Sequence, residues 1–390
     1  MKVLYITPWF PREDNPTSGV FVKELACAAS RENEVAVLYA YPQRKGDKLY
    51  SSREDAVGGL RVFYAGYRMI PPISYLQYAA SVFIEYRKLR KTFSPDIIHA
   101  HVYRSALVAV GLGKLYGVTV VATEHAEVVD TYRTGPLQRA KNLFSVAIAR
   151  LALNNADMLI LVSESVKEHL ESIGVRNRTE IVPNIVDTET FHPGTGKRDN
   201  AKKKVLYVGA LSPVKGVEYL IRAAGIVAKN RSDFTVDIVG AGGNRKEYEE
   251  LASSLGLGGT VSFHGGKSKD EVAEYMRRCD FFVLPSVYET FGVVLIEAMA
   301  CGKPVISTSG GGQKEIIDDR NGLLVPPRDA PALAKAIDWM LDHFGGYDSK
   351  AISRYAEERF SPAVVAGKLS RAYADARENA TSCGSSRRPA

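Results

Sequence analysis

The sequence predicts an α/β protein built from two doubly wound domains of similar size. Short apolar runs of strand length alternate with helical patterns along most of the chain, which is typical of βαβ units and parallel sheets. A polar segment rich in turn formers, residues 186–199, interrupts this alternation near the middle. With 390 residues the chain is also long for one core. We therefore expect an N-terminal domain over residues 1–185, a hinge over 186–199 and a second domain over 200–345.

The apolar runs place the expected strands, and amphipathic stretches between them place the helices. In the first half, strands are expected at 3–7, 34–40, 60–64, 96–99, 118–123 and 158–162, with helices near 20–30, 75–91, 105–116, 137–155 and 164–172. In the second half, strands are expected at 205–209, 235–240, 260–263, 281–284, 304–308 and 323–325, with helices near 217–229, 245–255, 268–279, 292–301 and 330–343.

Two features fix particular ends of these elements. Ser268 with Glu271 three residues later forms the pattern of a capping box, which predicts where one helix begins. A final helix over 361–378 is expected to pack back on the N-terminal domain. The following segment, 379–390, is polar, small and basic, and we expect a disordered tail.

Composition describes an ordinary globular protein of a reducing compartment. Hydrophobic residues make up 45% and charged residues 24% of the chain, and no apolar run approaches the ~18 residues that span a bilayer. The first residues, Met1–Pro8, resemble a buried strand rather than a signal peptide. Four cysteines lack the paired spacing of a zinc site or a disulfide framework. We expect free thiols and a cytoplasmic location.

Positive charge is concentrated in the first half. The net charge is +7, and residues 1–185 carry 23 Lys and Arg against 18 Asp and Glu. Segments 56–84 and 131–156 contain no acid, and the first of these is rich in aromatic residues. Such a surface would attract phosphates or an anionic membrane, although a solvated face beside a packed helix explains it equally well. Nothing in the pattern indicates nucleic-acid binding.

The most informative stretch runs from Pro285 to Gly302. An apolar strand ends at Pro285, a loop carries Glu289, and an apolar helix starts near Phe291 or Gly292 and carries Glu297. The helix N-terminus therefore faces the carboxyl edge of a sheet, where α/β proteins bind ligands. Free amides at Gly292, Val293 and Val294 would favour a phosphate.

Two carboxylates beside a phosphate site cannot also neutralise the phosphate. Glu289 and Glu297 are therefore expected to hold hydroxyl groups, and a ligand that has both phosphates and hydroxyls is a nucleotide sugar. The alternative is a solvated loop acid at Glu289 and a salt-bridge partner at Glu297.

These residues resemble those of retaining glycosyltransferases of family 4, which have the GT-B fold. The Glu-x7-Glu box is specific because Leu284-Pro285-Ser286 precedes it and Glu297-Ala298-Met299-Ala300-Cys301-Gly302-Lys303-Pro304 follows it. The resemblance implies two Rossmann-like domains facing a central cleft, with Glu297 on the ribose and Glu289 on the transferred sugar. It covers almost the whole chain and is strongest from Val205 to Val325.

Lys215 follows a strand in the segment Tyr207-Val208-Gly209-Ala210-Leu211-Ser212-Pro213-Val214-Lys215-Gly216. The resemblance places Gly209 and Lys215 at the donor diphosphate, where a cation would stabilise charge on the leaving phosphate. The family usually has Arg five residues earlier, where this chain has Ala210. Lys267 and Arg12 are candidates to supply that second cation; backbone amides are the alternative.

Several glycines are also implied to contact the donor. Gly240 and Gly242 end a strand in Gly240-Ala241-Gly242-Gly243, where the family commonly has an acid at the position of Ala241. Gly265 and Lys267 belong to the segment that lines the base pocket, and Gly310–Glu315 is implied to place amides around the phosphate or sugar, or to form a plain turn. Phe291 belongs to the start of the Glu297 helix.

In the first half, Gly19 resembles the family glycine whose amide approaches the donor phosphate, and an N-cap turn using Thr17 or Ser18 is the alternative. His125 follows a buried strand where the family often has a histidine, and it would face the transferred sugar. We expect Lys215, Glu289 and His125 to be the catalytic residues. His99 and His101 could line the acceptor cleft; a zinc pair there lacks a third ligand.

The resemblance implies transfer with retention, in which the diphosphate takes the acceptor proton. No Asp-x-Asp occurs in the chain, so we expect no metal and no other cofactor. Closure about the hinge would exclude water from the donor. Two other classes remain open: a nucleotide-sugar epimerase or hydrolase, for which Glu124 and Glu127 are candidate acids, and a non-catalytic nucleotide-sugar binding protein. A nicotinamide dehydrogenase would need Gly-x-Gly-x-x-Gly after the first strand.

The expected partners are a UDP- or GDP-sugar donor and a glycan or lipid-linked acceptor used in cell-surface polysaccharide or glycolipid synthesis. Acceptor specificity is expected around residues 64–84 and 132–150. Their aromatic and basic residues predict weak attachment to an anionic membrane surface at the inner face of the cell membrane.

Overall fold

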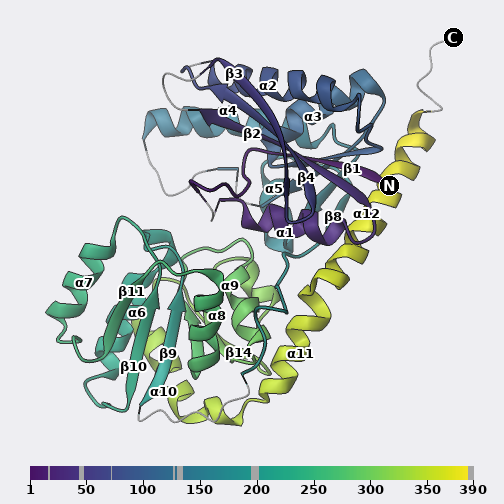
Figure 1. Cartoon of the computed structure of the whole chain (residues 1–390). Coiled ribbons are helices and arrows are strands. Elements are labelled where there is room, and N and C mark those ends of the chain that lie inside the picture. Colours follow the sequence, from purple (N-terminus) through teal and green to yellow (C-terminus); the bar gives the residue numbers. More distant parts are fainter. Residues whose placement is uncertain are drawn as a thin grey trace. The chain divides into compact units, whose positions relative to one another are not determined.

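The chain folds into two compact units, each an open sheet flanked by helices (Figure 1). Unit 1 comprises Met1–Ile185 and Pro362–Ala390, and unit 2 comprises Val186–Ser361. The computed structural model describes residues 1–15, 18–43, 48–71, 73–125, 128–129, 135–194 and 202–384. The expectation of two doubly wound α/β units is confirmed.

Unit 1 contains one eight-stranded sheet of order β3-β4-β2-β1-β5-β6-β7-β8. All its neighbouring strands are parallel except β3 and β4, which form an antiparallel hairpin at one edge. The strands are β1 (Lys2–Thr7), β2 (Glu34–Gln43), β3 (Tyr50–Val57), β4 (Leu60–Arg68), β5 (Ile97–His101), β6 (Thr119–Glu124), β7 (Met158–Leu161) and β8 (Thr179–Ile181). The helices are α1 (Val20–Ala29), α2 (Ser74–Leu89), α3 (Tyr103–Tyr116), α4 (Pro136–Leu153), α5 (Glu164–Ser172) and α12 (Pro362–Gly384).

Unit 2 contains a six-stranded parallel sheet of order β11-β10-β9-β12-β13-β14, the doubly wound order of nucleotide-binding sheets. Its strands are β9 (Lys203–Val208), β10 (Phe234–Val239), β11 (Val261–Gly265), β12 (Phe281–Leu284), β13 (Val305–Thr308) and β14 (Gly322–Val325). Its helices are α6 (Val217–Val227), α7 (Arg245–Ser254), α8 (Lys269–Arg278), α9 (Val293–Ala300), α10 (Ala330–His343) and α11 (Ser349–Phe360), with short 3-10 turns η1 (Pro213–Lys215), η2 (Gly312–Glu315) and η3 (Phe344–Gly346).

The final helix belongs to the core of unit 1. Val365, Leu369 and Tyr373 of α12 are completely buried, and the helix packs against α1, β6 and β7. The Tyr373 hydroxyl also pairs with that of Tyr5 in β1 at 2.8 Å. The chain therefore returns to unit 1 after unit 2 is complete.

Some expected boundaries differ from the structure. Unit 2 runs to Ser361 rather than 345, because α11, which was not expected, packs on α9. Residues 186–194, expected as hinge, belong to unit 2, where the Val186 amide donates to the carbonyl of Phe360. Helix α12 continues through Gly384 into the expected tail; residues 195–199 and 385–390 lie outside the described residues.

The predicted capping box at the start of α8 is confirmed. Ser268 accepts from the Glu271 amide, and the Glu271 carboxylate accepts from the Ser268 amide. At the other end of α8, the buried Lys303 donates to the carbonyls of Arg277 at 2.7 Å and Cys279 at 2.9 Å. Both ends of the helix that precedes β12 therefore have side-chain partners.

Candidate donor site and the histidine cluster

The loops that follow β9 and β12 meet where the strand order of unit 2 reverses. The chain leaves β9 toward β10 on one side and resumes at β12 on the other, so the two loops share the carboxyl edge of the sheet. The Val287 amide donates to the Val214 carbonyl at 2.8 Å and joins them. The topology thus places the predicted Lys215 and Glu289 at the position where doubly wound sheets bind ligands.

Lys215 and Glu289 form an ion pair at this point. The Lys215 ammonium donates to Oε2 of Glu289 at 2.6 Å, and Ser286 donates to the same oxygen at 3.3 Å. Both side chains are partly buried, with exposed fractions of 28% and 13%. The two predicted residues, which are far apart in the sequence, are therefore brought into direct contact.

Main-chain bonds fix the backbone of Glu289. Its amide donates to the Gly310 carbonyl at 3.2 Å, and its carbonyl accepts from the Gly312 amide at 2.8 Å. These bonds hold the loop after β13 beside the Glu289 loop as a short parallel bridge. The Gly310–Glu315 segment accordingly begins directly beside Glu289.

Helix α9 begins at this site without a side-chain cap. Gly292 occupies the N-cap position, so no side-chain oxygen covers the amides of the first turn. Val293 and Val294 are half-buried, and Glu297 is half-buried one turn further on. Phe291 differs: its ring is 4% exposed and packs edge-on against Phe360 of α11, so only its backbone can face a ligand.

The loop after β10 lies against the loop after β9. A Cβ at Gly240 would lie 1.8 Å from the Gly209 carbonyl oxygen, and Gly240 has φ of +153°, so only glycine fits there. Gly242 similarly abuts Leu211. Glycine at positions 240 and 242 allows the two loops to pack main chain against main chain. This packing explains both glycines whether or not a ligand binds.

The neighbouring Tyr207 is held in the same loops. Its buried hydroxyl donates to the carbonyl of Ala210 at 2.9 Å, which is the position where the family usually has arginine. Burial raises the pKa of Tyr207, and the nearby Glu289 charge raises it further. Tyr207 therefore remains a neutral donor near the Lys215–Glu289 pair.

Both candidates for the second cation already form an ion pair in this structure. Lys267, which follows Gly265 at the end of β11, pairs with Glu271 at 3.2 Å. Arg12 belongs to unit 1, where it pairs with Asp14 at 2.9 Å and lies over the ring of Tyr41.

In unit 1, Gly19 is the N-cap of α1. It has φ of +66°, and a Cβ there would lie 2.4 Å from the backbone of Trp9. No side chain caps this helix, so Ser18 does not serve as the N-cap; Thr17 lies outside the described residues. A close main-chain approach to the loop after β1 therefore explains the glycine.

His125 belongs to a cluster of three histidines at the carboxyl ends of β5 and β6. Nε2 of His125 and Nδ1 of His101 share a hydrogen bond at 2.9 Å, and their rings stack. The His99 ring lies tilted against that of His101, with ring centres 4.5 Å apart, and His99 bonds to Tyr373 of α12 at 2.8 Å and to Thr123 at 2.6 Å. Side chains two residues apart lie on the same face of a strand, so the His-x-His spacing in β5 already places His99 and His101 side by side.

The cluster is neutral and internal. Burial lowers the pKa of His99 and of His125 to about 3 and also lowers that of His101. His99 and His101 are fully buried, so the expectation that they line an acceptor cleft is wrong. His125 is half-buried against the ring of Phe21, and its Nδ1 has no hydrogen-bond partner among the described residues.

Glu124 has a structural task. It is 2% exposed, and its two oxygens accept from the amides of Tyr103 at 2.9 Å and His125 at 3.2 Å. This carboxylate ties the loop after β5 to the end of β6. Glu127 lies outside the described residues. Within the described ranges, no three His, Cys, Asp or Glu side chains form a group that could hold a metal.

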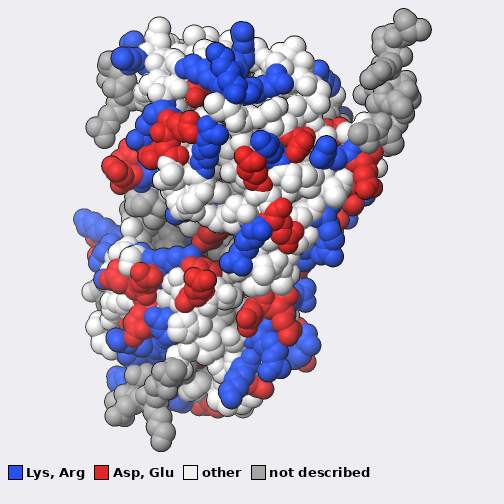
Figure 2. Space-filling model, turned by 45° about the vertical axis from the view of Figure 1, so that its right-hand side comes forward, with Lys and Arg blue, Asp and Glu red and all other residues white. Residues whose placement is uncertain are grey.

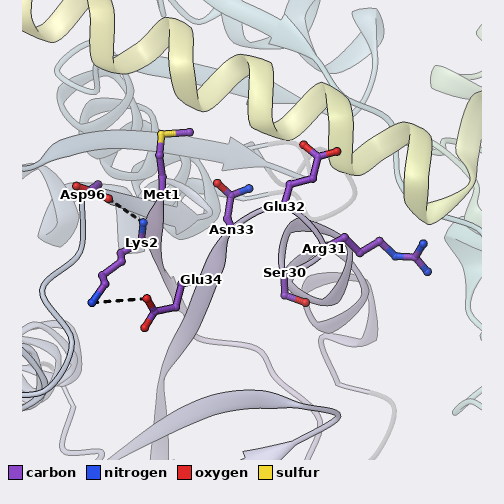
Figure 3. Close-up of a pocket in the computed structure, with 8 residues that line it drawn as sticks. All are labelled: Met1, Lys2, Ser30, Arg31, Glu32, Asn33, Glu34 and Asp96. Atoms are coloured by element: carbon purple, nitrogen blue, oxygen red, sulfur yellow. Dashed lines mark hydrogen bonds and ion pairs between the residues drawn. The ribbon is translucent and has the colours of Figure 1, made fainter.

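A polar hollow lies at the opposite, amino edge of the unit 1 sheet (Figure 3). Lys2 pairs with Glu34 at 3.5 Å, and its amide donates to Asp96 at 2.8 Å. These groups join β1, β2 and the turn before β5, and we assign the hollow a structural role.

The two Rossmann-like units, one of which carries a lysine–carboxylate pair beside an uncapped helix start, agree with the GT-B fold that the sequence resemblance implies. Comparison with known families agrees. The model for glycosyl transferases group 1 matches residues 188–359, and the model for glycosyltransferase family 4 matches residues 18–190. The chain therefore belongs to the glycosyltransferase family that these two models describe, and it is a glycosyltransferase.

Similar proteins differ in their named substrates. A D-inositol 3-phosphate glycosyltransferase of Corynebacterium urealyticum is 31% identical over 70% of each chain. A glycogen synthase of Mycobacterium tuberculosis is 26% identical over 88% of this chain and 86% of its own length. Sucrose-phosphate synthase from Thermosynechococcus elongatus has a similar fold, with a TM-score of 0.76 at 24% identity, covering 96% of this chain and 98% of its own.

Proposed function

We propose that this glycosyltransferase moves a hexosyl group from a UDP- or GDP-sugar to a glycan or lipid-linked acceptor, with retention of configuration and without a metal. The observation that carries the proposal is the Lys215–Glu289 pair at the switch point of the unit 2 sheet, beside the open N-terminus of α9. An Anabaena protein of similar fold, with a TM-score of 0.75 at 20% identity over 96% of this chain and all of its own, has been crystallised with UDP.

The ion pair between Lys215 and Glu289 would keep both charged groups at the site available for a donor. Lys215 and Glu289 neutralise one another in this structure, so neither charge is buried alone. A diphosphate would compete for the ammonium, and sugar hydroxyls would compete for the carboxylate. The amides of Val293 and Val294 and the helix dipole would add to the phosphate contact.

Catalysis would follow from charge and position. As the bond between sugar and diphosphate lengthens, negative charge grows on the leaving oxygens, and Lys215 stabilises it. The departing diphosphate takes the acceptor proton on the same face, so the configuration is retained. His125 stays neutral because burial lowers its pKa to about 3, and it would contact the sugar as a hydrogen-bonding group rather than as a cation.

The test combines donor binding with turnover. Thermal shift with UDP-, GDP- and ADP-sugars identifies the donor, because bound ligand raises the melting temperature by mass action. Lys215→Gln and Glu289→Gln should each abolish the shift or the transfer, and Lys246→Gln, which removes an exposed lysine on α7, should change neither. Release of nucleotide without acceptor would instead indicate a hydrolase or epimerase, and retained activity in EDTA is expected.

We also propose that unit 1 attaches to an anionic membrane surface through α4. This helix contains no acid, and Leu143, Phe144 and Leu151 lie 72%, 69% and 57% exposed on it. Exposed Arg139 and Lys141 border them. An exposed apolar stripe with basic flanks is typical of helices that lie in a bilayer interface. No described helix is long and apolar enough to cross a membrane.

Lys and Arg side chains also gather at the upper end of the view in Figure 2, with mostly uncharged residues beside them. Vesicle flotation tests the attachment through α4. Wild type should float with vesicles containing phosphatidylglycerol in a salt-sensitive manner, and Leu143→Ser with Phe144→Ser should abolish flotation. Leu115→Ser, at a leucine of α3 that is 61% exposed, is the matched control. Equal flotation of neutral and anionic vesicles would contradict the proposal.

A further inference from the structure

We propose that an aromatic pocket in unit 1 binds the acceptor as a hydroxylated ring that carries an anionic group, a phosphate or a carboxylate. This inference rests on the proposed transferase function and names the chemical class of its acceptor. The pocket has a volume of about 450 Å³, and its aromatic lining residues are Trp9, Tyr67, Tyr75, Tyr78 and Tyr103. Its charged lining residues are Arg104 and the buried Glu124, whose two oxygens already accept from the amides of Tyr103 and His125.

The pocket lies where the topology of unit 1 predicts a ligand. Trp9 follows β1, Tyr67 ends β4, and Tyr103 follows β5, so its walls come from the carboxyl ends of three strands of the parallel part of the sheet. The strand order reverses between β1 and β5. Open α/β sheets bind ligands in the crevice at such a point.

Fixed aromatic faces give the pocket its shape. Tyr75 stacks on Tyr78 with ring centres 6.1 Å apart, and Tyr67 packs edge-on against Tyr78 at 5.9 Å. The Tyr78 hydroxyl is anchored on Ser105 at 2.7 Å. Flat faces with polar tips suit a ring that is apolar on its C–H face and hydroxylated at its edge. A lipid chain would gain nothing from the oriented hydroxyl groups.

Arg104 supplies the charge. Its Nε donates to the Tyr103 hydroxyl at 3.1 Å, and its carbonyl accepts from the Tyr75 hydroxyl at 2.8 Å. Arg104 is exposed, and among the described residues no carboxylate pairs with it. Burial raises the pKa of Tyr75 to about 12, while the Arg104 charge acts to lower it. A guanidinium held beside neutral phenols can bind a phosphate or carboxylate through two parallel hydrogen bonds.

The backbone beneath the pocket is strained. Val102 has φ of +65°, a region that β-branched residues rarely adopt. Its amide donates to the Thr123 carbonyl at 2.8 Å, and the neighbouring Tyr103 amide donates to Glu124. These bonds hold the turn that presents Tyr103 and Arg104. Strain of this kind is concentrated at ligand sites, and it agrees with the placement of the pocket.

The experiment uses Trp9 as the reporter. The chain has two tryptophans, so Trp339→Phe leaves Trp9, in the pocket wall, as the single indole. Glucose 6-phosphate, glucuronic acid, methyl glucoside and inorganic phosphate are titrated separately while Trp9 fluorescence is followed. The two anionic sugars should bind at least tenfold more tightly than methyl glucoside and than inorganic phosphate. The preferred one of the two identifies phosphate or carboxylate.

Variants separate the charge from the ring. In the Trp339→Phe background, Arg104→Gln should weaken both anionic sugars at least tenfold and leave methyl glucoside unchanged, while Arg104→Lys should restore part of the loss. Tyr75→Ala should weaken all three sugars. Arg87→Gln, at an exposed arginine of α2 outside the pocket, is the matched control. The melting temperature of each variant shows whether it folds.

Three outcomes would overturn the inference: equal binding of neutral and anionic sugars, equal binding of inorganic phosphate, or no effect of Arg104→Gln. Failure of the proposed function looks different. If nucleotide sugars bind and turn over but the pocket takes no anionic sugar, only the acceptor class is wrong. If the pocket binds acidic sugars but no UDP- or GDP-sugar raises the melting temperature, the proposed donor class is wrong instead.

Discussion

Unit 1 should lose stability as the pH falls below about 6.5, because of its three buried histidines. His99, His101 and His125 are neutral in the folded protein because burial lowers the pKa of each, to about 3 for His99 and His125. In the unfolded chain each would titrate near its ordinary pKa of about 6.5. The unfolded state therefore binds more protons as the pH falls below this value, and stability that is present above it is lost.

The size of the effect follows from linkage. Well below pH 6.5, each histidine lowers the free energy of unfolding by about 1.4 kcal/mol per pH unit. Between pH 7.5 and 5.5 this amounts to about 1.4 kcal/mol for one histidine and about 4 kcal/mol for three. Since domains are stable by only about 5–15 kcal/mol, the loss should be readily measured.

The assay is urea unfolding of the Trp339→Phe variant, in which Trp9 is the single tryptophan. Trp9 belongs to unit 1, so its fluorescence follows the unfolding of unit 1 alone. The two units are therefore not treated as one unfolding transition. His99→Asn should lower stability at all pH values and reduce the pH slope by one histidine. His343→Asn, at an exposed histidine of unit 2, should leave the slope unchanged. A free energy that does not vary between pH 7.5 and 5.5, or a slope unchanged by His99→Asn, would refute the argument.

Three further predictions concern single side chains. Lys215→Gln should reduce kcat by about 10²–10³ in a transfer assay, since it removes a cation from the leaving group, whereas Lys215→Arg should recover part of the rate; an unaffected kcat would contradict the role. Gly19→Ala should destabilise unit 1 by about 1–3 kcal/mol in the Trp9 assay, because of its positive φ and its overlap with the Trp9 backbone, and a neutral result would show that the loop can shift. Lys303→Met should lower the free energy of unfolding of unit 2 by about 1–3 kcal/mol, because the carbonyls of Arg277 and Cys279 lose a buried donor. Unfolding of unit 2 is followed through Trp339 in a Trp9→Phe background. Lys350→Met, at an exposed lysine, is the control.

Much of the fold was predictable because alternation and helical periodicity are local. The strands of both sheets and the Ser268–Glu271 cap follow from neighbours in the chain. Strand β3 was missed because Tyr50–Val57 is polar and mostly exposed, so it lacks the apolar run of a buried strand. Helix α11 was missed because its apolar face is narrow and its partner, α9, is distant in the sequence.

The residues of the candidate site could be predicted from the sequence, but their contacts with one another could not. The residue types of Lys215 and Glu289 indicated phosphate and hydroxyl binding, whereas their pairing depends on two loops meeting at a strand reversal. The expectation for His99 and His101 is wrong because both rings pack inside unit 1. His99 bonds to Tyr373 of α12, whereas His101 stacks on Tyr5 and bonds to His125. No local pattern shows that a residue of the last helix packs against the fifth strand.

The return of α12 makes unit 1 discontinuous, and this has a consequence for how the chain matures. During synthesis, the first 185 residues leave the ribosome without the helix that supplies Val365, Leu369 and Tyr373 to their core. Unit 2 is contiguous and is able to reach its native state first. A nascent chain arrested after Ser361 should therefore yield a protease-resistant second unit and a digestible first one, and addition of the last helix as a separate peptide should restore protection.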